Sequence, residues 1–338
     1  DICINTKDIL LNNADYVIFD LETTGLSARY DRIIEFGATK YSHGQEYDKR
    51  DFFINPNRKL RDVIKNKTNI TQEMVDGGKP IKEALQEILD YFGDAVIIDH
   101  NAAFDIGFLN EALKKNGLPE IKNPIIDTLP WSRYMFPKQR SHTLEAVART
   151  LGIEYDETKV HRAIYDAEVL EAVYIGMLSR VSEENPNIKM ADLADLTSKD
   201  VILNARPKHI VAYAKNEQGL KDLYKIISLS STDYLSDVPK TPRFLVDENR
   251  ENLLIGSACF NGEVFDSALT KSESVLKRVM SWYDYIEVQP PACYSWLIND
   301  GQISSEEDLE KIIADLINAA KSINKTVVAT SDCHYLNK

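Results

Sequence analysis

The sequence lacks the features that mark membrane, exported and disulfide-stapled proteins. Its 338 residues contain no run of eighteen apolar residues, and no basic-then-apolar signal opens the chain, so we expect neither a membrane span nor export. The four cysteines are widely and irregularly spaced, without a C-x-x-C pair. That spacing suits a reducing cytoplasm and argues against a disulfide framework. The first residue is Asp1 rather than methionine, so we expect a piece of a longer chain.

The sequence also lacks an excess of positive charge. Its 53 acidic residues outnumber its 40 basic residues, which gives a formal net charge of −13. Proteins that bind nucleic acid normally need a basic surface for their phosphate contacts, so this balance argues against autonomous tight DNA binding. A negative net charge is still compatible with a nuclease that binds only a strand end, if divalent cations neutralise its acidic pocket and another part of the protein holds the duplex.

The chain is long enough for two domains, and its first half alternates predicted strands and helices. Three strands are predicted at residues 16–20, 33–41 and 51–54. The turn-forming residues between the second and third strands predict that the three form an antiparallel meander. The other predicted elements are a short helix that starts at Thr71, helices at residues 81–91, 104–116, 143–151 and 163–178, and a buried strand at 95–98.

Residues 183–200 are polar and form the best candidate for a linker. The region after them again has α/β character but looks too short and open-ended to be complete. Its predicted elements are strands at residues 210–214, 285–288 and 326–329, helices at 218–229 and 306–323, and a strand–turn–strand region around 253–265.

Three segments of the first region carry five residues suited to metal-dependent phosphodiester hydrolysis: YVIFDLETTGL from residue 16, HNAAFDIGFL from residue 100 and HRAIYDAEVL from residue 161. Asp20 and Glu22 stand two apart in a strand, so both carboxylates point to one face. Asp105 lies at the start of a helix, where the dipole favours a carboxylate. Residues five apart on one helix are separated by roughly 140° at ~3.6 residues per turn. We therefore expect His161 on an approach loop and Asp166 in the first helical turns.

This inventory fits a two-metal hydrolase. Two Mg²⁺ or Mn²⁺ ions activate a water and relieve charge on the leaving oxygen, and carboxylate oxygens suit those metals. A neutral histidine beside the water takes its proton near neutral pH. Each motif alone has a common structural explanation: a solvated strand edge, a helix cap, or surface decoration. Their joint presence in this order predicts an active site.

The three segments resemble the DEDDh branch of the DnaQ-like 3′→5′ exonucleases, in which FDLETTG, HNAAFD and HRAIYDA each match a motif. The resemblance implies an α/β, ribonuclease-H-like fold with a mixed sheet flanked by helices. It implies that Asp20, Glu22 and Asp166 are metal ligands, that Asp105 serves the second metal, and that His161 is the general base. The matched motifs also supply candidates for substrate contacts, which are Thr23, Gly25, Leu26, Asn101 and Phe104.

Segments of the second region resemble the polymerase-and-histidinol-phosphatase (PHP) domain of bacterial replicative polymerases. They begin at Asn204 (NARPKHIVAYA), Gly256 (GSACFNGEVF), Tyr283 (YDYIEVQPP) and Val327 (VVATSDCHYL). An exonuclease followed by this half-domain resembles the PolC-type DNA polymerase III family, in which the proofreading domain is inserted into the PHP domain. The implied layout is an N-terminal segment leading out of the PHP domain at residues 1–13, the exonuclease at 14–180, a linker at 181–200, and the C-terminal part of the α/β barrel-like PHP domain at 201–338.

By the same resemblance, His209, Cys259, Asp332 and His334 are candidate ligands of a PHP cluster that would hold Zn²⁺ or Mn²⁺ in an intact domain. Such domains open with an H-x-H pair, and none of the six histidines forms one here. We therefore expect an incomplete PHP metal site in this chain. A buried Cys259 and a strand-end Asp332 with purely structural roles are the alternative.

The leading functional hypothesis is proofreading, the removal of mispaired 3′-terminal deoxynucleotides as 5′-monophosphates. An RNA-processing exonuclease of the same fold is the nearest rival, because the motifs do not separate the two sugars. A non-catalytic scaffold is a third interpretation, and it suits residues 201–338 best. The resemblance implies as partners the single-stranded 3′ end of a primer, the rest of the polymerase chain and, through it, a sliding clamp, all in the bacterial cytoplasm.

Overall fold

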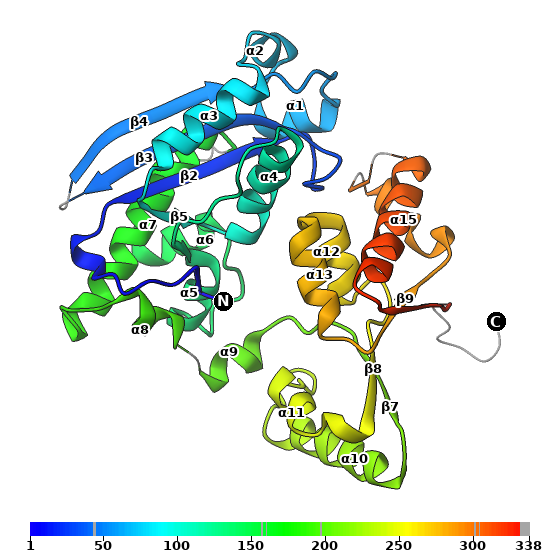
Figure 1. Ribbon diagram of the computed structural model, residues 1–338. Coiled ribbons are helices and arrows are strands. Elements are labelled where there is room, and N and C mark those ends of the chain that lie inside the picture. Colours follow the sequence, from blue (N-terminus) through cyan, green and yellow to red (C-terminus); the bar gives the residue numbers. More distant parts are fainter. Residues whose placement is uncertain are drawn as a thin grey trace. The chain divides into compact units, whose positions relative to one another are not determined.

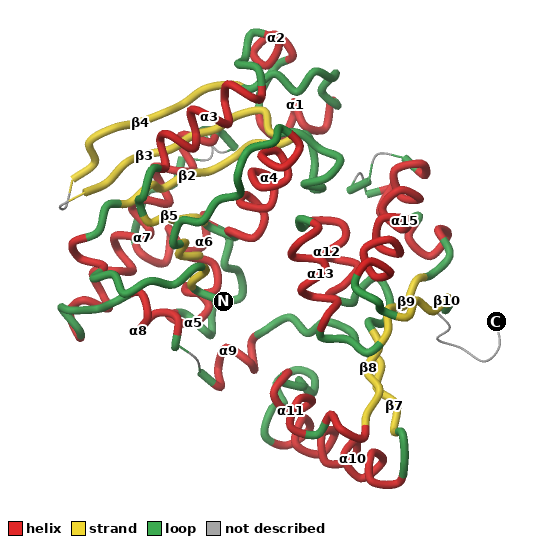
Figure 2. The backbone as a smooth tube through the Cα atoms, in the orientation of Figure 1, coloured by secondary structure: helices red, strands yellow, loops and turns green. Residues whose placement is uncertain are grey.

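The computed structural model describes residues 1–42, 45–156, 158–159, 161–196, 198–300, 302–303 and 305–331. The chain divides into two compact units, Asp1–Thr197 and Ser198–Lys338. Both units are α/β (Figures 1 and 2). No helix among the described residues is long and apolar enough to cross a membrane.

The first unit is built on a six-stranded mixed sheet in the order β1-β6-β5-β2-β3-β4. Its strands are β1 (Cys3–Ile4), β2 (Tyr16–Thr23), β3 (Ile33–Ser42), β4 (Gln45–Phe53), β5 (Val96–Asp99) and β6 (Ile125–Asp127). β2, β3 and β4 form an antiparallel meander, while β5 and β6 run parallel to β2. The predicted antiparallel meander and the predicted α/β fold with a mixed sheet are confirmed for this unit.

β4 begins at Gln45, earlier than the strand predicted at residues 51–54. The added residues are mostly polar or charged and largely exposed, because β4 is the edge of the sheet. Charged side chains are a usual feature of edge strands, where they discourage pairing with other chains. A search for hydrophobic strand patterns therefore finds only the apolar end of β4.

Helices cover both faces of the sheet, which explains why β2 is buried almost continuously rather than alternately. On one face Val17, Phe19 and Leu21 pack against α3 (Ile81–Phe92) and α4 (Ala102–Lys115). On the other, Tyr16 and Ile18 join the core formed with α5 (Thr128–Met135), α6 (Leu144–Leu151) and α7 (Ala163–Glu184). The apolar residues on either side of Asp20 thus enter a core.

Two short helices, α1 (Asp62–Thr68) and α2 (Gln72–Asp76), connect β4 to α3. Thr71 caps α2 as the sequence predicts, because its hydroxyl accepts a hydrogen bond from the Met74 amide. The pair packs through a small apolar cluster of its own, which includes Leu60, Ile70 and Val75.

Residues 1–13 and much of 181–196 pack against the exonuclease-like sheet and helices. Strand β1 pairs with β6, and Leu11, in the 3₁₀ turn η1 (Leu11–Asn13), is fully buried. The Leu11 amide donates to the Ile188 carbonyl, and Met190 at the start of α8 (Met190–Ala194) is buried in the same core. Residues 183–196 are mostly polar, so their sequence indicates a linker, although a few buried apolar residues attach the segment to the first unit.

The second unit contains a four-stranded sheet in the order β10-β9-β8-β7. β8 (Leu253–Gly256), β9 (Tyr285–Val288) and β10 (Thr326–Ala329) are parallel, and β7 (Val211–Ala214) is antiparallel to β8. Its other elements are α9 (Lys199–Asn204), α10 (Glu217–Thr232), α11 (Arg243–Glu248), η2 (Arg250–Asn252), α12 (Glu263–Thr270), α13 (Glu273–Ser281), η3 (Pro291–Tyr294), α14 (Trp296–Asn299) and α15 (Glu306–Ser322).

The expected strand–turn–strand region at residues 253–265 is wrong in its second half. β8 ends at Gly256, and the segment after Gly262 starts helix α12. Helix α12 has buried side chains at Val264 and Phe265, and again one turn later at Ala268 and Leu269. This is helical spacing, but a fragment that ends at residue 265 is too short to reveal the period.

Candidate active site

The two residues of the D-x-E motif stand at the end of the central strand. β2 continues beyond its parallel neighbour: Ile18 pairs with Ile98, so Asp20 lies next to the point where β5 ends. In the antiparallel ladder Asp20 faces Gly37, and Glu22 faces Glu35. Because α4 starts just after β5, Asp105 in its first turn is brought to the same end of the sheet.

The entry to α4 is fixed by a residue that the sequence reasoning did not select. Asp127, at the end of β6, accepts hydrogen bonds from the amides of Asn101 and Ala102 at 2.9 and 3.0 Å, and from the Leu129 amide at 3.0 Å. One carboxylate thus caps α5 and holds the left-handed Asn101, which has φ 84°. The only sequence signal for this role is an acid after a short apolar run, which is too common to stand out.

The third motif reaches the site through the start of α7. His161 lies just before the helix with φ 60°, and Asp166 is in the first turns, as the five-residue spacing predicts. The His161 amide donates to Asp166 Oδ2 at 3.0 Å. Asp166 Oδ1 is buried and accepts no hydrogen bond from the described residues.

Strand β3 holds this helix start in place. Glu35 is fully buried, and its Oε1 lies 2.8–2.9 Å from the guanidinium nitrogens of Arg162, while its Oε2 accepts from the Ala163 amide at 3.0 Å. Gly37 allows the close approach, because a Cβ there would lie 2.1 Å from the Ile164 nitrogen. Glu35 and Arg162 are positioning residues that the motifs did not indicate.

Ligand-type atoms converge at this end of the sheet. One atom each of Glu22, His161 and Asp166 lie within 4.8 Å of one another, a spacing that can hold a metal ion. No other group of three or more such residues was found among the described residues. Asp105 is 4% exposed, and the charges of Asp105, Asp166, Glu22 and Asp99 all act on Asp20. The structure therefore brings the five predicted residues together.

The electrostatics are those of crowded, desolvated carboxyl groups. Desolvation raises the pKa of Asp20 well above its usual range, and the neighbouring charges of Asp105 and Asp166 raise it further. Burial and Asp166 raise the pKa of Glu22 to about 8. Burial also raises the pKa of Asp166 to about 6, against the hydrogen bond from the His161 amide. Such a cluster is relieved by a bound cation.

One basic side chain, Lys67, changes the pKa values of the site residues. Lys67 lies in the last turn of α1, and its charge lowers the pKa of Glu22 and of Asp166. Burial lowers the pKa of His161, and Lys67 lowers it further, which favours the neutral form of the imidazole. No sequence pattern indicates a role for Lys67, since its segment carries no motif.

The predicted substrate contacts lie around the same strand end. Thr23 is buried and its hydroxyl donates to the Gly25 carbonyl at 2.7 Å, while the Leu26 side chain is 37% exposed. Asn101 is exposed, and Phe104 is half-buried against Phe108 with ring centroids 4.9 Å apart. Leu26 and Asn101 are thus the most accessible of the five.

In the second unit two of the four predicted PHP ligands meet. His209 Nδ1 lies 3.3 Å from Cys259 Sγ, beyond the end of β8. Asp332 and His334 lie outside the described residues. The described part of the chain offers His209 and Cys259 no third ligand with metal-site spacing.

Known proteins resemble this chain over the first unit and over nearly its whole length. Residues 17–174 match the family described as Exonuclease. The chain is 40% identical over 335 residues to the DNA polymerase III PolC-type of Staphylococcus epidermidis and 39% identical to that of Staphylococcus aureus; each alignment covers 99% of this chain and 23% of the relative. A solved complex of E. coli ExoI with single-stranded DNA, in its zinc-bound form, has a TM-score of 0.46 and 20% identity, over 53% of this chain and 42% of that one.

The first unit therefore contains an exonuclease domain. Over nearly its whole length the chain is similar to DNA polymerase III of the PolC type, and it spans 23% of the length of the curated relatives that it matches.

Proposed function

We propose that the first unit is the proofreading 3′→5′ exonuclease of a replicative DNA polymerase. It would remove 3′-terminal deoxynucleotides and release them as 5′-monophosphates. The observation that carries the proposal is the convergence of Glu22, His161 and Asp166, with ligand atoms within 4.8 Å, beside Asp20 and Asp105. A carboxylate cluster with one neutral histidine is the donor set for hydrolysis assisted by hard divalent cations.

The residues present fit two Mg²⁺ or Mn²⁺ ions. Their donors are hard carboxylate oxygens, the pKa values of three of the carboxyl groups are raised, and Asp166 Oδ1 is buried without a hydrogen bond from the described residues. Asp20, Glu22 and Asp166 would be metal ligands, with Asp105 serving the second ion. When bound, the ions supply an activated water and offset charge on the leaving oxygen.

The protein's own part in the reaction is a proton transfer and the placement of the strand end. His161 accepts the proton of the attacking water at a ring nitrogen, and its lowered pKa keeps that nitrogen free near pH 7. The 3.0 Å bond from its amide to Asp166 keeps the base beside the carboxylates. The exposed Leu26 would flank the terminal base, and the other proposed substrate contacts are Thr23, Gly25, Asn101 and Phe104.

The polymerase context rests on the PolC-type relatives. We assign residues 14–180 to the exonuclease domain and residues 201–338 to the C-terminal part of a PHP domain, which acts as scaffold for the polymerase. The partners would be the single-stranded 3′ end of a primer, the rest of the polymerase chain and a sliding clamp, in the bacterial cytoplasm. His209, Cys259, Asp332 and His334 would contribute to a PHP metal site only with residues beyond this chain.

The test is a time course on a 5′-labelled primer–template with a 3′ mismatch, with Mg²⁺, Mn²⁺ or EDTA. Metal-dependent shortening from the 3′ end is expected, faster on the mismatched than on the paired primer, and lost in Asp20→Ala. A matched RNA oligonucleotide serves as the second substrate. A strong preference for RNA would overturn the proofreading assignment, and full-rate cleavage by Asp20→Ala would overturn the site.

A further inference from the structure

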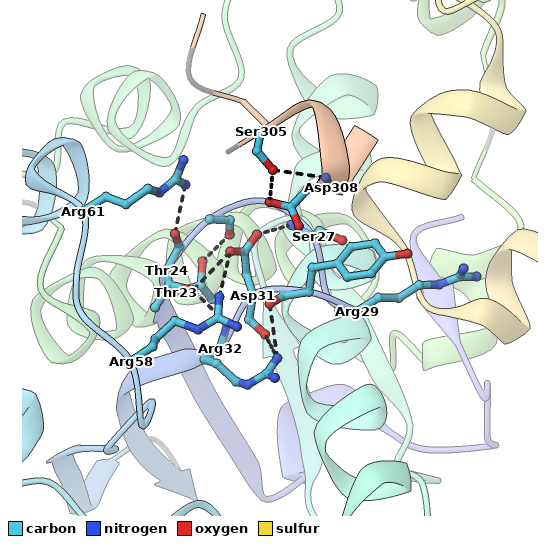
Figure 3. A network of polar contacts seen from close by, with 12 residues as sticks. Thr23, Thr24, Ser27, Arg29, Asp31, Arg32, Arg58, Arg61, Ser305 and Asp308 are labelled. Atoms are coloured by element: carbon cyan, nitrogen blue, oxygen red, sulfur yellow. Dashed lines mark hydrogen bonds and ion pairs between the residues drawn. The ribbon is translucent and has the colours of Figure 1, made fainter. Parts of the chain in front are cut away.

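A group of arginines surrounds the loop that leaves the catalytic strand. Arg32 ends this loop before β3, and Arg58 and Arg61 follow β4 (Figure 3). The chain has a net charge of −13, so a group of arginines beside the D-x-E strand is unusual. Such a group is suited to binding an anion. The hydrolysis described above uses none of these three side chains.

The loop is held rigidly by short hydrogen bonds. The Thr24 amide donates to the Arg32 carbonyl at 2.9 Å, and the Arg32 amide donates to the Thr24 hydroxyl at 2.9 Å. Asp31 accepts from the Thr24 hydroxyl at 3.2 Å and from the Ser27 amide at 3.0 Å. Gly25 allows Asp31 to lie this close, since a Cβ would be 2.4 Å from its Oδ2. The arginines therefore sit on a fixed frame.

Two of the guanidinium groups donate to neutral carbonyls. Arg32 Nη1 donates to the carbonyls of Tyr30 and Asp31 at 3.2 and 2.9 Å, and Arg61 Nη2 donates to the Thr24 carbonyl at 3.1 Å. Arg58 lies 3.9 Å from Asp31 Oδ1, and its side chain is 39% exposed. Carbonyl bonds orient a guanidinium without cancelling its charge, and the Asp31 carboxylate already accepts from the loop.

Arg32 and Arg58 line a cavity of about 300 Å³ together with Asn55, Asn57 and the apolar side chains of Ile33 and Ile81. Such a space holds roughly ten waters at about 30 Å³ each, enough for a phosphate group with part of its hydration. Two guanidinium groups and the Asn57 side-chain amide are donors suited to phosphate oxygens, while the Asn55 amide already donates to the Asp76 carbonyl at 3.2 Å. Burial and the neighbouring Arg58 charge also lower the pKa of Arg32, so an anion would relieve mutual repulsion.

The loop that ends at Arg32 follows directly on the catalytic strand β2. Thr24, which bonds Arg32, follows Glu22 by two residues, a span of roughly 7 Å in extended chain. We propose that the cavity binds a backbone phosphate of the strand that is being cleaved, on the 5′ side of the terminal nucleotide. This inference rests on the proposed exonuclease function. It explains how an acidic chain holds a polyanion: contact is concentrated at a few arginines beside the strand end.

Arg58 is the residue to test, because it is exposed and its replacement leaves the loop bonds intact. Binding of a 5′-fluorescein-labelled ten-residue oligothymidylate is followed by anisotropy in EDTA, with Asp20→Ala as the parent chain. Arg58→Ala is expected to raise Kd roughly tenfold, the usual effect of losing one charge-assisted hydrogen bond. The slope of log Kd against log salt should fall by about 0.7, as for one lost phosphate contact.

Arg58→Lys keeps the charge, so it should restore the salt slope even where Kd recovers only in part. Arg149→Ala is the matched control: it removes an exposed arginine of α6 that pairs with Glu145, and it should leave both quantities unchanged. An Arg58→Ala chain with the parent Kd and salt slope would overturn the proposal, as would a parent chain that binds no oligonucleotide.

A second measurement locates the phosphate. Methylphosphonate linkages remove the charge of one phosphate at a time from the oligonucleotide. One linkage near the 3′ end should weaken binding to the parent chain and have little further effect on Arg58→Ala. Losses that simply add at every linkage would contradict direct contact. Because binding is measured without turnover, the two proposals fail separately: if Asp20→Ala binds DNA but the unsubstituted chain cleaves nothing with Mg²⁺ or Mn²⁺, the proposed function fails and this inference stands.

Discussion

The backbone amide of His161 donates a hydrogen bond of 3.0 Å to Asp166 Oδ2. This bond links the proposed general base to a proposed metal ligand without using the imidazole. It is possible because His161 adopts φ 60° just before the helix, a conformation that non-glycine residues rarely adopt. The side chain is thereby left free to face the site, and the base and the carboxylate keep a fixed relation.

Replacing His161 with alanine should remove catalysis and spare the structure. The amide bond to Asp166 does not depend on the side chain, so α7 should start unchanged. Loss of the proton acceptor is expected to lower kcat by roughly 10²–10⁴-fold, with the melting temperature within a degree or two of the parent's. Single-turnover cleavage and thermal unfolding check the two halves of this prediction. Cleavage by His161→Ala at the parent rate would exclude the proposed base.

Replacing Glu22 with glutamine should stabilise the metal-free chain at alkaline pH. The pKa of Glu22 is raised to about 8 in the folded chain, against about 4.3 in an unfolded one. Between these values the folded state holds a proton that the unfolded state has released, so the free energy of unfolding falls as pH rises through this window. Without the carboxyl group this loss disappears.

The same variant should lose stabilisation by metal. Mg²⁺ or Mn²⁺ should raise the melting temperature of the parent chain, because a ligand that binds only the folded state adds about 2.7 kcal/mol at one hundred times its Kd. Melting curves at pH 6 and pH 8.5, with EDTA and with each metal, measure both effects. A Glu22→Gln chain that is stabilised by metal as strongly as the parent would show that this carboxylate is not a ligand.

Arg162→Ala should destabilise the fold, because it removes the ion-pair partner of the buried Glu35. Glu35 is fully buried and pairs with Arg162 at 2.8 Å. Removal of one partner of a buried pair costs about 3 kcal/mol, and the start of α7 that carries Asp166 should loosen as well. Urea unfolding and cleavage rate are the measurements. The double variant Glu35→Gln with Arg162→Met is the control, and it should be more stable than Arg162→Ala; the reverse order would refute the pairing argument.

The five residues of the candidate site were predictable because each lies in a local motif. The D-x-E pair needs only strand geometry, and the five-residue spacing of His161 and Asp166 already requires a break before the helix. The Glu35–Arg162 pair spans 127 positions, and no local pattern joins the two residues. Asp127 likewise acts on Asn101 from another strand. Residues that position a site through tertiary contacts are found only when the sheet order is known.

The fold was predictable where hydrophobic periodicity is strong and less so elsewhere. The meander and α3, α4, α6 and α7 follow from apolar patterns that the structure confirms. The polar end of β4 and the start of α12 did not follow, since an edge strand exposes charge and a helix seen for one turn has no visible period. The three residues of β6 form a strand because parallel β5 pairs with them, which no window of that length can indicate.

Replacing His100 with glutamine should reduce the acid sensitivity of the first unit. His100 Nε2 donates to the His142 carbonyl at 2.8 Å, and Nδ1 lies 2.8 Å from the Thr128 hydroxyl. Burial lowers the pKa of His100 to about 4. Between pH 6.5 and 4 the unfolded chain therefore binds a proton that the folded chain does not, and the free energy of unfolding falls as pH is lowered through this range, by about 3 kcal/mol in all.

Glutamine retains a donor for the His142 carbonyl but does not titrate. We expect His100→Gln to be less stable than the parent at pH 7.5, because the ring packing is lost. The difference in the free energy of unfolding between the two chains, called the gap below, should narrow steadily toward pH 4.5. Urea unfolding in EDTA at several pH values measures the gap, and the difference between the two chains cancels the contribution of the acidic cluster, which changes with pH in the opposite direction. Two curves that stay parallel from pH 7.5 to pH 4.5 would show that the His100 ring is not held neutral in the folded chain.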